Sequence, residues 1–362
     1  MQYPCIEIDL QKIYENSRRA LASCRAHGVE PVGVTKVCCA EPAVAETMVQ
    51  AGFTMLADSR LDNLERIAHI NVPKMLLRLP MVSEAERAVQ LADVSLISEK
   101  RTAEALSAAA MRQNKQHGVI LMMELGDLRE GCADEAAVFE LAKLCISLEG
   151  LDLQGIGGNL ICYGGAMPSV ENQGQLITLR DRLENQLGIK LPVVSGGNSA
   201  VENIMTRGKL PNGVNQLRIG AMIHAGIGLM DEPIKGYHTD AYVIHAEVIE
   251  RNRKPTMPYG ELGTDAFGQK RDWIDYGEIE RAIVAIGRAD CDLESLTPVD
   301  AGVKVLGASS DHLIVDLSRS KQKYMVGDKV SFYAGYVSIL RACMSRYVKV
   351  NFKNRIDSLA RN

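Results

Sequence analysis

The sequence predicts a (β/α)8 barrel followed by an antiparallel β domain, and two observations lead to this fold class. Over the first two-thirds of the 362 residues, short apolar runs rich in β-branched side chains alternate with longer amphipathic stretches. This alternation is typical of parallel βα units. Beyond about residue 225 the helical periods fade, and short strands punctuated by Gly and Pro follow one another instead.

Eight apolar runs are the expected barrel strands, and segments of helical period separate them. The runs cover residues 31–36, 55–58, 75–79, 94–98, 119–124, 153–156, 192–195 and 216–219. We therefore expect the barrel over residues 11–225. The β domain is expected over residues 226–362, together with an N-terminal strand within residues 1–10.

Composition excludes several classes of function. The formal charge is −4 with acids and bases interspersed, whereas a nucleic-acid-binding protein has a basic face. The chain contains no run of 18 apolar residues, so no membrane span is expected. Glu7 and Asp9 lie where a signal peptide needs its apolar stretch, which favours a cytoplasmic protein. Nine scattered cysteines without a CxxC pair predict reduced thiols and no metal site.

The segment GVTK ends the first expected strand in a lysine, Lys36. In the mouth of a barrel, burial disfavours an ammonium group and lowers the pKa of a lysine. A neutral amine is what Schiff-base chemistry with an aldehyde requires. Taken alone, the segment also fits an ordinary exposed lysine at a strand end.

Two further segments form a candidate phosphate cradle. SGGNSA contains Asn198 and Ser199 after the seventh strand, and LRIGAMI contains Gly220 and Ala221 after the eighth. Small residues at a helix N-terminus expose backbone N–H groups, and phosphate sites recur beside strands seven and eight of this fold. Arg218 points into the barrel and needs an anionic or acceptor partner there, because an unpaired buried arginine is costly.

The order of these motifs resembles the alanine racemase family, whose members use pyridoxal phosphate (PLP). The matching segments are GVTK, LREG, NLICYG, GGNSA, LRIGA, PYG and GASSDHLIVDL, and together they cover nearly the whole chain. The series is most similar to the ornithine racemase branch. The resemblance implies the barrel and β domain, PLP as cofactor, and an amino acid as the small-molecule substrate.

The resemblance also implies roles for single residues. Lys36 carries the cofactor as a Schiff base and is one catalytic acid/base, and Tyr259 is the second, supplied by the partner subunit of a homodimer. Arg218 donates to the pyridine nitrogen of PLP, and Arg129 supports the substrate carboxylate. The matched phosphate contacts are Ser199, Gly220, Ala221 and Tyr336, with Asn198 beside them in the cradle. Ser310 and Asp311 match a loop that approaches the substrate carboxylate from the partner chain.

Two departures from the family pattern affect the expected substrate. Asn159 replaces a histidine that packs against the cofactor ring, and an aromatic phosphate contact is missing from VCCAEP. We therefore expect a substrate other than alanine. A carboxylate that pairs with a distal ammonium favours ornithine, ahead of lysine. The candidates are Asp290, Asp292, Asp311 and Glu124, although Asp290 and Asp292 are equally compatible with solvated loop carboxylates.

Other functions remain open at this point. Cys291-Asp292 resembles the motif of PLP decarboxylases with the same barrel, and a broad-specificity alanine racemase is a second alternative. A non-enzymatic PLP-binding regulator would lack the β domain and Tyr259. A zinc-assisted aldolase would need a pair of metal ligands, and neither His224 nor His312 has a partner at metal-binding spacing.

Overall fold

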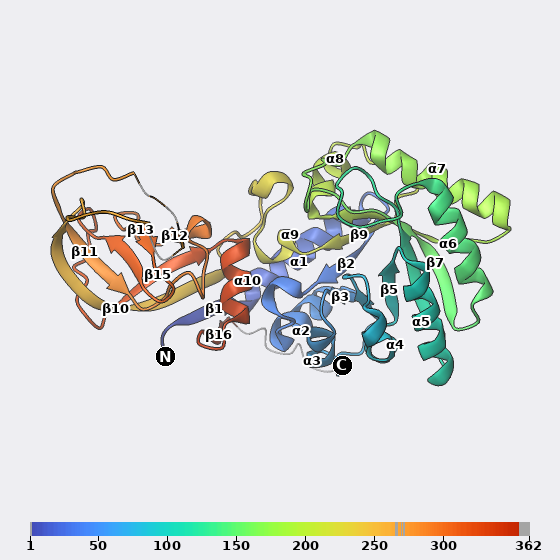
Figure 1. The fold of residues 1–362 in the computed structure, drawn as a ribbon, viewed down its shortest axis with the longest axis horizontal. Helices are drawn as coiled ribbons and strands as arrows, with labels where there is room; N and C mark the ends of the chain where they lie inside the picture. The colour runs from blue at the N-terminus through green and yellow to red at the C-terminus, as the bar shows by residue number, and fades with distance from the viewer. Residues whose placement is uncertain (1, 265–266, 269, 271, 355–362) are drawn as a thin grey trace. The chain divides into compact units, whose positions relative to one another are not determined.

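The computed structural model describes residues 2–264, 267–268, 270 and 272–354. The chain divides into two compact units. The barrel unit comprises Leu10–Thr239, and the β unit comprises the chain up to Asp9 and from Asp240 onward. Figure 1 shows the strands and helices of both units.

Eight parallel strands close into a barrel, which confirms the predicted fold class. They are β2 (Glu30–Val34), β3 (Leu56–Asp58), β4 (Lys74–Leu76), β5 (Val94–Ile97), β6 (His117–Met122), β7 (Leu151–Gly157), β8 (Val193–Asn198) and β9 (Gln216–Ile219). The barrel closes where β2 pairs with β9, with Val32 opposite Arg218. Apolar side chains fill its interior, among them Val32, Val34 and Ile120.

Helices follow the strands and cover the barrel (Figure 1). They are α1 (Leu10–Arg25), α2 (Pro42–Ala51), α3 (Leu61–Arg66), α4 (Ala85–Leu91), α5 (Lys100–Arg112), α6 (Glu135–Ser147), α7 (Val170–Leu187), α8 (Glu202–Thr206) and α9 (Ala221–His224). Local sequence sets their ends, as α7 illustrates. Ser169 and Asn172 form a reciprocal capping box at its start, and Gly188 ends it with a φ of 65°.

The barrel unit extends beyond its expected end at residue 225, as far as Thr239. The sequence of the segment 226–239 has no helical period, but the segment is hydrogen-bonded to α1. The Asn16 Nδ2 donates to the backbone oxygen of His238 over 2.8 Å, and the Asn16 Oδ1 accepts from the backbone nitrogen of His238 over 2.8 Å.

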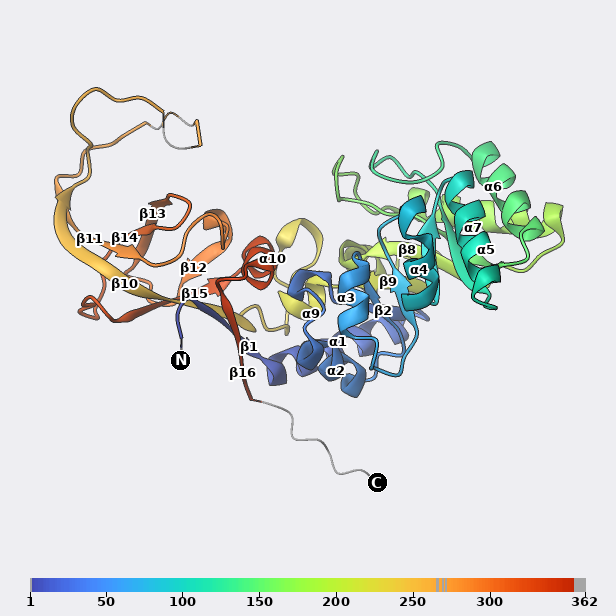
Figure 2. The same ribbon diagram turned by 60° about the horizontal axis from the view of Figure 1, so that its bottom comes forward.

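The β unit is an eight-stranded sheet (Figure 2). Its strands are β1 (Cys5–Asp9), β10 (Tyr242–Pro255), β11 (Glu278–Val284), β12 (Leu296–Pro298), β13 (Lys304–Ala308), β14 (Leu313–Asp316), β15 (Lys329–Ala334) and β16 (Lys349–Lys353), and α10 (Tyr336–Met344) joins the last two. The strand pairs are antiparallel except β1 and β16, which pair in parallel. The N-terminal strand pairs with β10 on its other side.

Candidate active site

The candidate active-site residues of the barrel lie where its strands end. Lys36 follows β2 in a 3-10 turn, η1 (Lys36–Cys38), and Arg129 lies in the loop after β6. Asn159 follows β7, and Arg218 lies within β9. Because all eight strands are parallel, their carboxyl ends open at one face, which is where barrel enzymes hold their active sites.

Lys36 is half-buried, and its side-chain amine makes no hydrogen bond or ion pair with any residue that the structure describes. Burial lowers its pKa, and the positive charges of Arg129 and Arg218 lower it further. The Asp58 carboxylate acts in the opposite direction. The environment therefore favours the neutral amine, which is the nucleophilic form of a lysine.

The backbone that carries Lys36 is fixed from two sides. Thr35 Oγ1 donates to Asp58 Oδ2 over 2.8 Å, and Asp58 is itself fully buried at the end of β3. Asp58 Oδ1 also accepts from the backbone nitrogen of Arg60 over 3.0 Å, ahead of α3. On the other side, Nε2 of the buried His224 lies 2.9 Å from the carbonyl oxygen of Val34. Since a carbonyl only accepts, Nε2 carries the hydrogen.

This histidine makes the stability of the barrel depend on pH. Burial lowers the pKa of His224 to about 4, whereas an unfolded histidine titrates near 6.5. Between these pH values the unfolded state binds a proton that the folded state does not. The free energy of unfolding therefore falls as pH falls, by about 2 kcal/mol for this residue between pH 7 and pH 5.

A His224→Gln variant keeps an N–H donor but does not titrate, so we expect a weaker pH dependence of its unfolding. Urea titrations at pH 7 and pH 5 measure this difference. His27→Gln, which changes an exposed histidine, is the control and should behave as the wild type does. An unchanged pH dependence in His224→Gln would contradict the argument.

Arg218 is a buried cation, only 5% exposed. Its Nη1 donates to Ser195 Oγ over 2.5 Å, and its Nη2 donates to the carbonyl oxygen of Gly158 over 2.7 Å. Burial lowers its pKa to about 10, so the group is charged at neutral pH. It forms no ion pair within the described ranges of the chain, and a buried charge of this kind favours an electronegative ligand atom.

The predicted phosphate cradle is built from two strand ends. Ser199 Oγ accepts from the backbone nitrogens of Gly220 (3.2 Å) and Met222 (3.4 Å), which joins the end of β8 to the start of α9. Ala221 is the first residue of α9, and the first N–H groups of a helix have no acceptor within it. A side chain at Gly220 would place its Cβ 3.3 Å from the Cβ of Val34.

These features fit PLP. A lysine amine whose pKa is lowered by burial suits its aldehyde, a buried guanidinium suits the ring nitrogen, and backbone N–H groups suit its phosphate. Asn198, which was also expected at the cofactor, is engaged within the protein. Its Nδ2 donates to the carbonyl oxygen of Leu160 over 2.8 Å, and its Oδ1 accepts from the backbone nitrogen of Ala200 over 2.9 Å.

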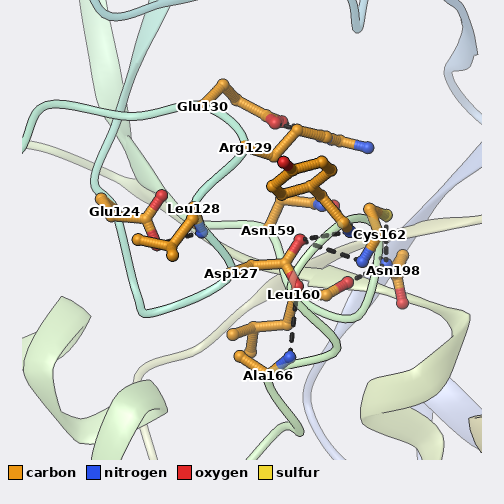
Figure 3. A network of polar contacts seen from close by, with 12 residues as sticks. Glu124, Asp127, Leu128, Arg129, Glu130, Asn159, Leu160, Cys162, Ala166 and Asn198 are labelled. Carbon is orange, nitrogen blue, oxygen red and sulfur yellow. Dashed lines mark hydrogen bonds and ion pairs between the residues drawn. The ribbon is translucent and has the colours of Figure 1, made fainter.

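Arg129 and Asn159 lie side by side (Figure 3). With the amide oriented so that its oxygen faces the guanidinium, Asn159 accepts from Arg129 Nη2 over 3.0 Å and from the backbone nitrogen of Leu160 over 3.2 Å. Arg129 also forms an ion pair with Glu130. Sequence reasoning missed Glu130 and the buried Asp127, because an acidic residue in a loop gives no signal of its partners.

The other expected site residues belong to the β unit. Tyr259 is 92% exposed and lies in the long loop between β10 and β11, which extends away from the sheet in Figure 2. Tyr336 begins α10. Ser310 and Asp311 are exposed in the turn between β13 and β14, where Ser310 Oγ donates to Asp311 Oδ2 over 2.5 Å. Asp290 is buried and accepts from Ser345 Oγ over 2.6 Å.

The residues that the structure describes contain neither a helix suited to span a membrane nor a metal-binding cluster. No helix there combines the length and the apolar character needed to span a membrane. No cluster of three or more His, Cys, Asp or Glu side chains in the same ranges is placed to hold a metal ion.

Comparison with known proteins links this geometry to one family. Residues 8–226 match the sequence model described as "Alanine racemase, N-terminal domain". An ornithine racemase from Acetoanaerobium sticklandii is 40% identical over 348 residues, which are 96% of this chain and 99% of that protein. A lysine racemase from Thermotoga maritima is 39% identical over 352 residues, 96% of this chain and 98% of that protein.

The fold also matches a solved structure. The alanine racemase from Streptomyces lavendulae superimposes with a TM-score of 0.73 over 98% of this chain and 99% of that one, at 16% sequence identity.

Proposed function

The chain belongs to the alanine racemase family and is an amino-acid racemase, and we propose that it interconverts the L and D forms of a basic amino acid, ornithine ahead of lysine, with PLP as its cofactor. We also propose a homodimer with shared active sites, working in the cytoplasm. All nine cysteines are free thiols in the structure, which suits a reducing compartment.

The observation that carries the proposal is the setting of Lys36. Its amine lies at the active-site face, is shifted toward the neutral form by burial, and has Arg129 and Arg218 in its electrostatic neighbourhood. PLP, when bound, supplies a conjugated ring that acidifies the Cα–H of an amino acid. Racemisation then requires a proton to leave one face of Cα and to return on the other.

Different residues transfer the protons, bind the substrate and hold the cofactor. Lys36 holds or donates the proton at its Nζ on one face, and Tyr259 of the partner subunit does so at its Oη on the other. Arg129 binds and orients the substrate carboxylate. Arg218 donates to the ring nitrogen and, because a guanidinium does not readily give up its proton, it keeps that nitrogen unprotonated. Ser199, Gly220 and Ala221 bind the phosphate.

The substrate preference rests on a carboxylate for the distal ammonium. Glu124 is engaged, because its Oε1 accepts from the backbone nitrogen of Leu128 over 3.0 Å. Asp290 accepts from Ser345, and Asp292 lies 3.7 Å from the guanidinium of Arg341. Asp311 is exposed and its partner is a neutral hydroxyl. Asp311 is therefore the candidate that a substrate ammonium reaches most readily.

A substrate panel tests the proposal. We expect kcat/KM for D- and L-ornithine and for lysine to exceed that for alanine by at least about tenfold, the equivalent of 1.4 kcal/mol of differential binding. Chiral chromatography of each reaction measures the rates. Alanine turning over fastest would contradict the substrate preference, and carbon dioxide release from L-ornithine would favour a decarboxylase instead.

A further inference from the structure

Two loops at the mouth of the barrel meet at one buried carboxylate. The β6 loop (residues 123–134) carries Arg129, and the β7 loop (residues 158–169) begins beside Asn159. Asp127 belongs to the β6 loop, yet it is only 1% exposed. In Figure 3 its carboxylate faces the backbone of the β7 loop.

The β6 loop is held in shape by its own bonds. Glu124 Oε1 accepts from the backbone nitrogens of Gly126 and Leu128. The ends of the loop pair with each other, since the backbone nitrogen of Glu124 donates to the carbonyl oxygen of Cys132 over 3.0 Å. A Cβ on Gly131 would lie 2.4 Å from the backbone nitrogen of Glu124, so the closure needs glycine there. The loop therefore presents Asp127 from a fixed backbone.

The β7 loop instead depends on Asp127. The Asp127 Oδ2 accepts from the backbone nitrogens of Cys162 (2.9 Å) and Tyr163 (3.0 Å), and its Oδ1 accepts from that of Ala166 (3.2 Å). The Asp127 carbonyl oxygen accepts from the backbone nitrogen of Gly164 over 2.8 Å. Consecutive N–H groups that converge in this way form a concave anion site, and here the anion is a side chain of the neighbouring loop.

The joined loops place the arginine. Arg129 follows Asp127 by two residues, and its guanidinium meets Asn159 at the start of the β7 loop. Leu160, the next residue, is held through its carbonyl oxygen by Asn198 at the end of β8. Without the carboxylate of Asp127, three backbone donors of the β7 loop lose their acceptor, while the bond from the backbone nitrogen of Gly164 to the carbonyl oxygen of Asp127 and the attachment at the base of the loop remain.

We infer that Asp127 is a positioning residue for the racemase reaction: it locks the β7 loop onto the β6 loop and so fixes Arg129 beside Asn159, where it binds the substrate carboxylate. The inference rests on the proposed function. Asp127 acts through Arg129 and not on the reacting atoms. Its loss should therefore weaken substrate binding much more than it slows the chemical step.

Hydrogen–deuterium exchange of the holoenzyme tests the contact directly. Peptides covering residues 160–168 should exchange at least about tenfold faster in Asp127→Ala than in the wild type, since the amides of Cys162, Tyr163 and Ala166 lose their acceptor. Asp134→Ala is the matched control. It removes an acidic side chain of the same loop that caps α6 through the backbone nitrogen of Ala137, and it should leave these peptides unchanged.

Steady-state kinetics on ornithine tests the consequence. Asp127→Ala should raise KM about tenfold with a smaller change in kcat and with the cofactor content of the wild type, because an interaction shared by bound substrate and transition state is lost. Asp127→Asn keeps one acceptor oxygen, so its KM should lie between those of the wild type and Asp127→Ala. It also provides a milder variant if Asp127→Ala folds poorly.

Two results would overturn the inference while the wild type is active: unchanged exchange at residues 160–168, or faster exchange with an unchanged KM. A wild-type protein that racemises no amino acid would overturn the proposed function as well.

Discussion

A Lys36→Ala variant is expected to fold and to lose racemisation by at least about a thousandfold, because the proposed function makes Lys36 both the attachment point of the cofactor and one of two proton-transfer groups. The surrounding structure favours this double role. Burial lowers the pKa of the amine, so a larger fraction is neutral at working pH than for an exposed lysine. The same variant should retain less PLP after dialysis.

Chiral assays with ornithine and the cofactor content after dialysis measure these losses, and circular dichroism checks the fold. Lys100→Ala is the control, because Lys100 is exposed at the start of α5 on the barrel surface. It should keep full activity and cofactor content. A Lys36→Ala protein that racemises at more than a few per cent of the wild-type rate would remove Lys36 from its assigned role.

Local patterning was enough to predict the barrel. Most of the barrel strands contain a short run of apolar residues, because strands that are buried on both faces do not alternate apolar with polar side chains. Lys36 could be placed for the same reason, since it ends the first such run and the fold directs strand ends to the active-site face. The prediction that Arg218 has an acceptor partner inside the barrel followed from the free-energy cost of burying an unpaired guanidinium.

The contacts between loops could not be predicted. In the sequence, Asp127 is simply one acidic residue of a loop. Only the folded chain brings three backbone N–H groups of residues 162–166 to its carboxylate. The bond from Thr35 to Asp58 has the same origin, because it joins the ends of two neighbouring strands that lie 23 residues apart in the sequence. Side-chain chemistry is visible in a sequence, whereas the partner of a side chain is set by the fold.

The carboxylates of the β unit that could pair with a distal substrate ammonium illustrate the same limit of sequence-based prediction. Asp290, Asp292 and Asp311 are chemically equivalent in the sequence, but the structure gives them different surroundings. Asp290 is buried against Ser345, Asp292 faces Arg341, and Asp311 is exposed. Burial and hydrogen bonding determine which carboxylate is available to a ligand, and neither can be inferred from the identity of the residue.

A Tyr259→Phe variant is expected to lose racemisation by at least about a hundredfold while it keeps its cofactor, since the substitution removes the hydroxyl that we propose as the second proton-transfer group and retains the aromatic ring. Tyr259 is almost fully exposed in its own β unit, and its hydroxyl makes no hydrogen bond with any residue that the structure describes. Tyr276→Phe is the matched control. It removes a second exposed tyrosine hydroxyl from the same loop and should leave the rate unchanged.

Mixing the two inactive variants tests whether the site is shared between subunits. In a dimer that pairs a Lys36→Ala subunit with a Tyr259→Phe subunit, one site combines the intact Lys36 with the intact Tyr259 from the other chain. Random reassociation of equal amounts makes half of the dimers mixed, so about a quarter of the wild-type activity should return. No recovery from a mixture shown to contain such dimers would place Lys36 and Tyr259 of each site on the same chain, and the proposed shared site would be wrong.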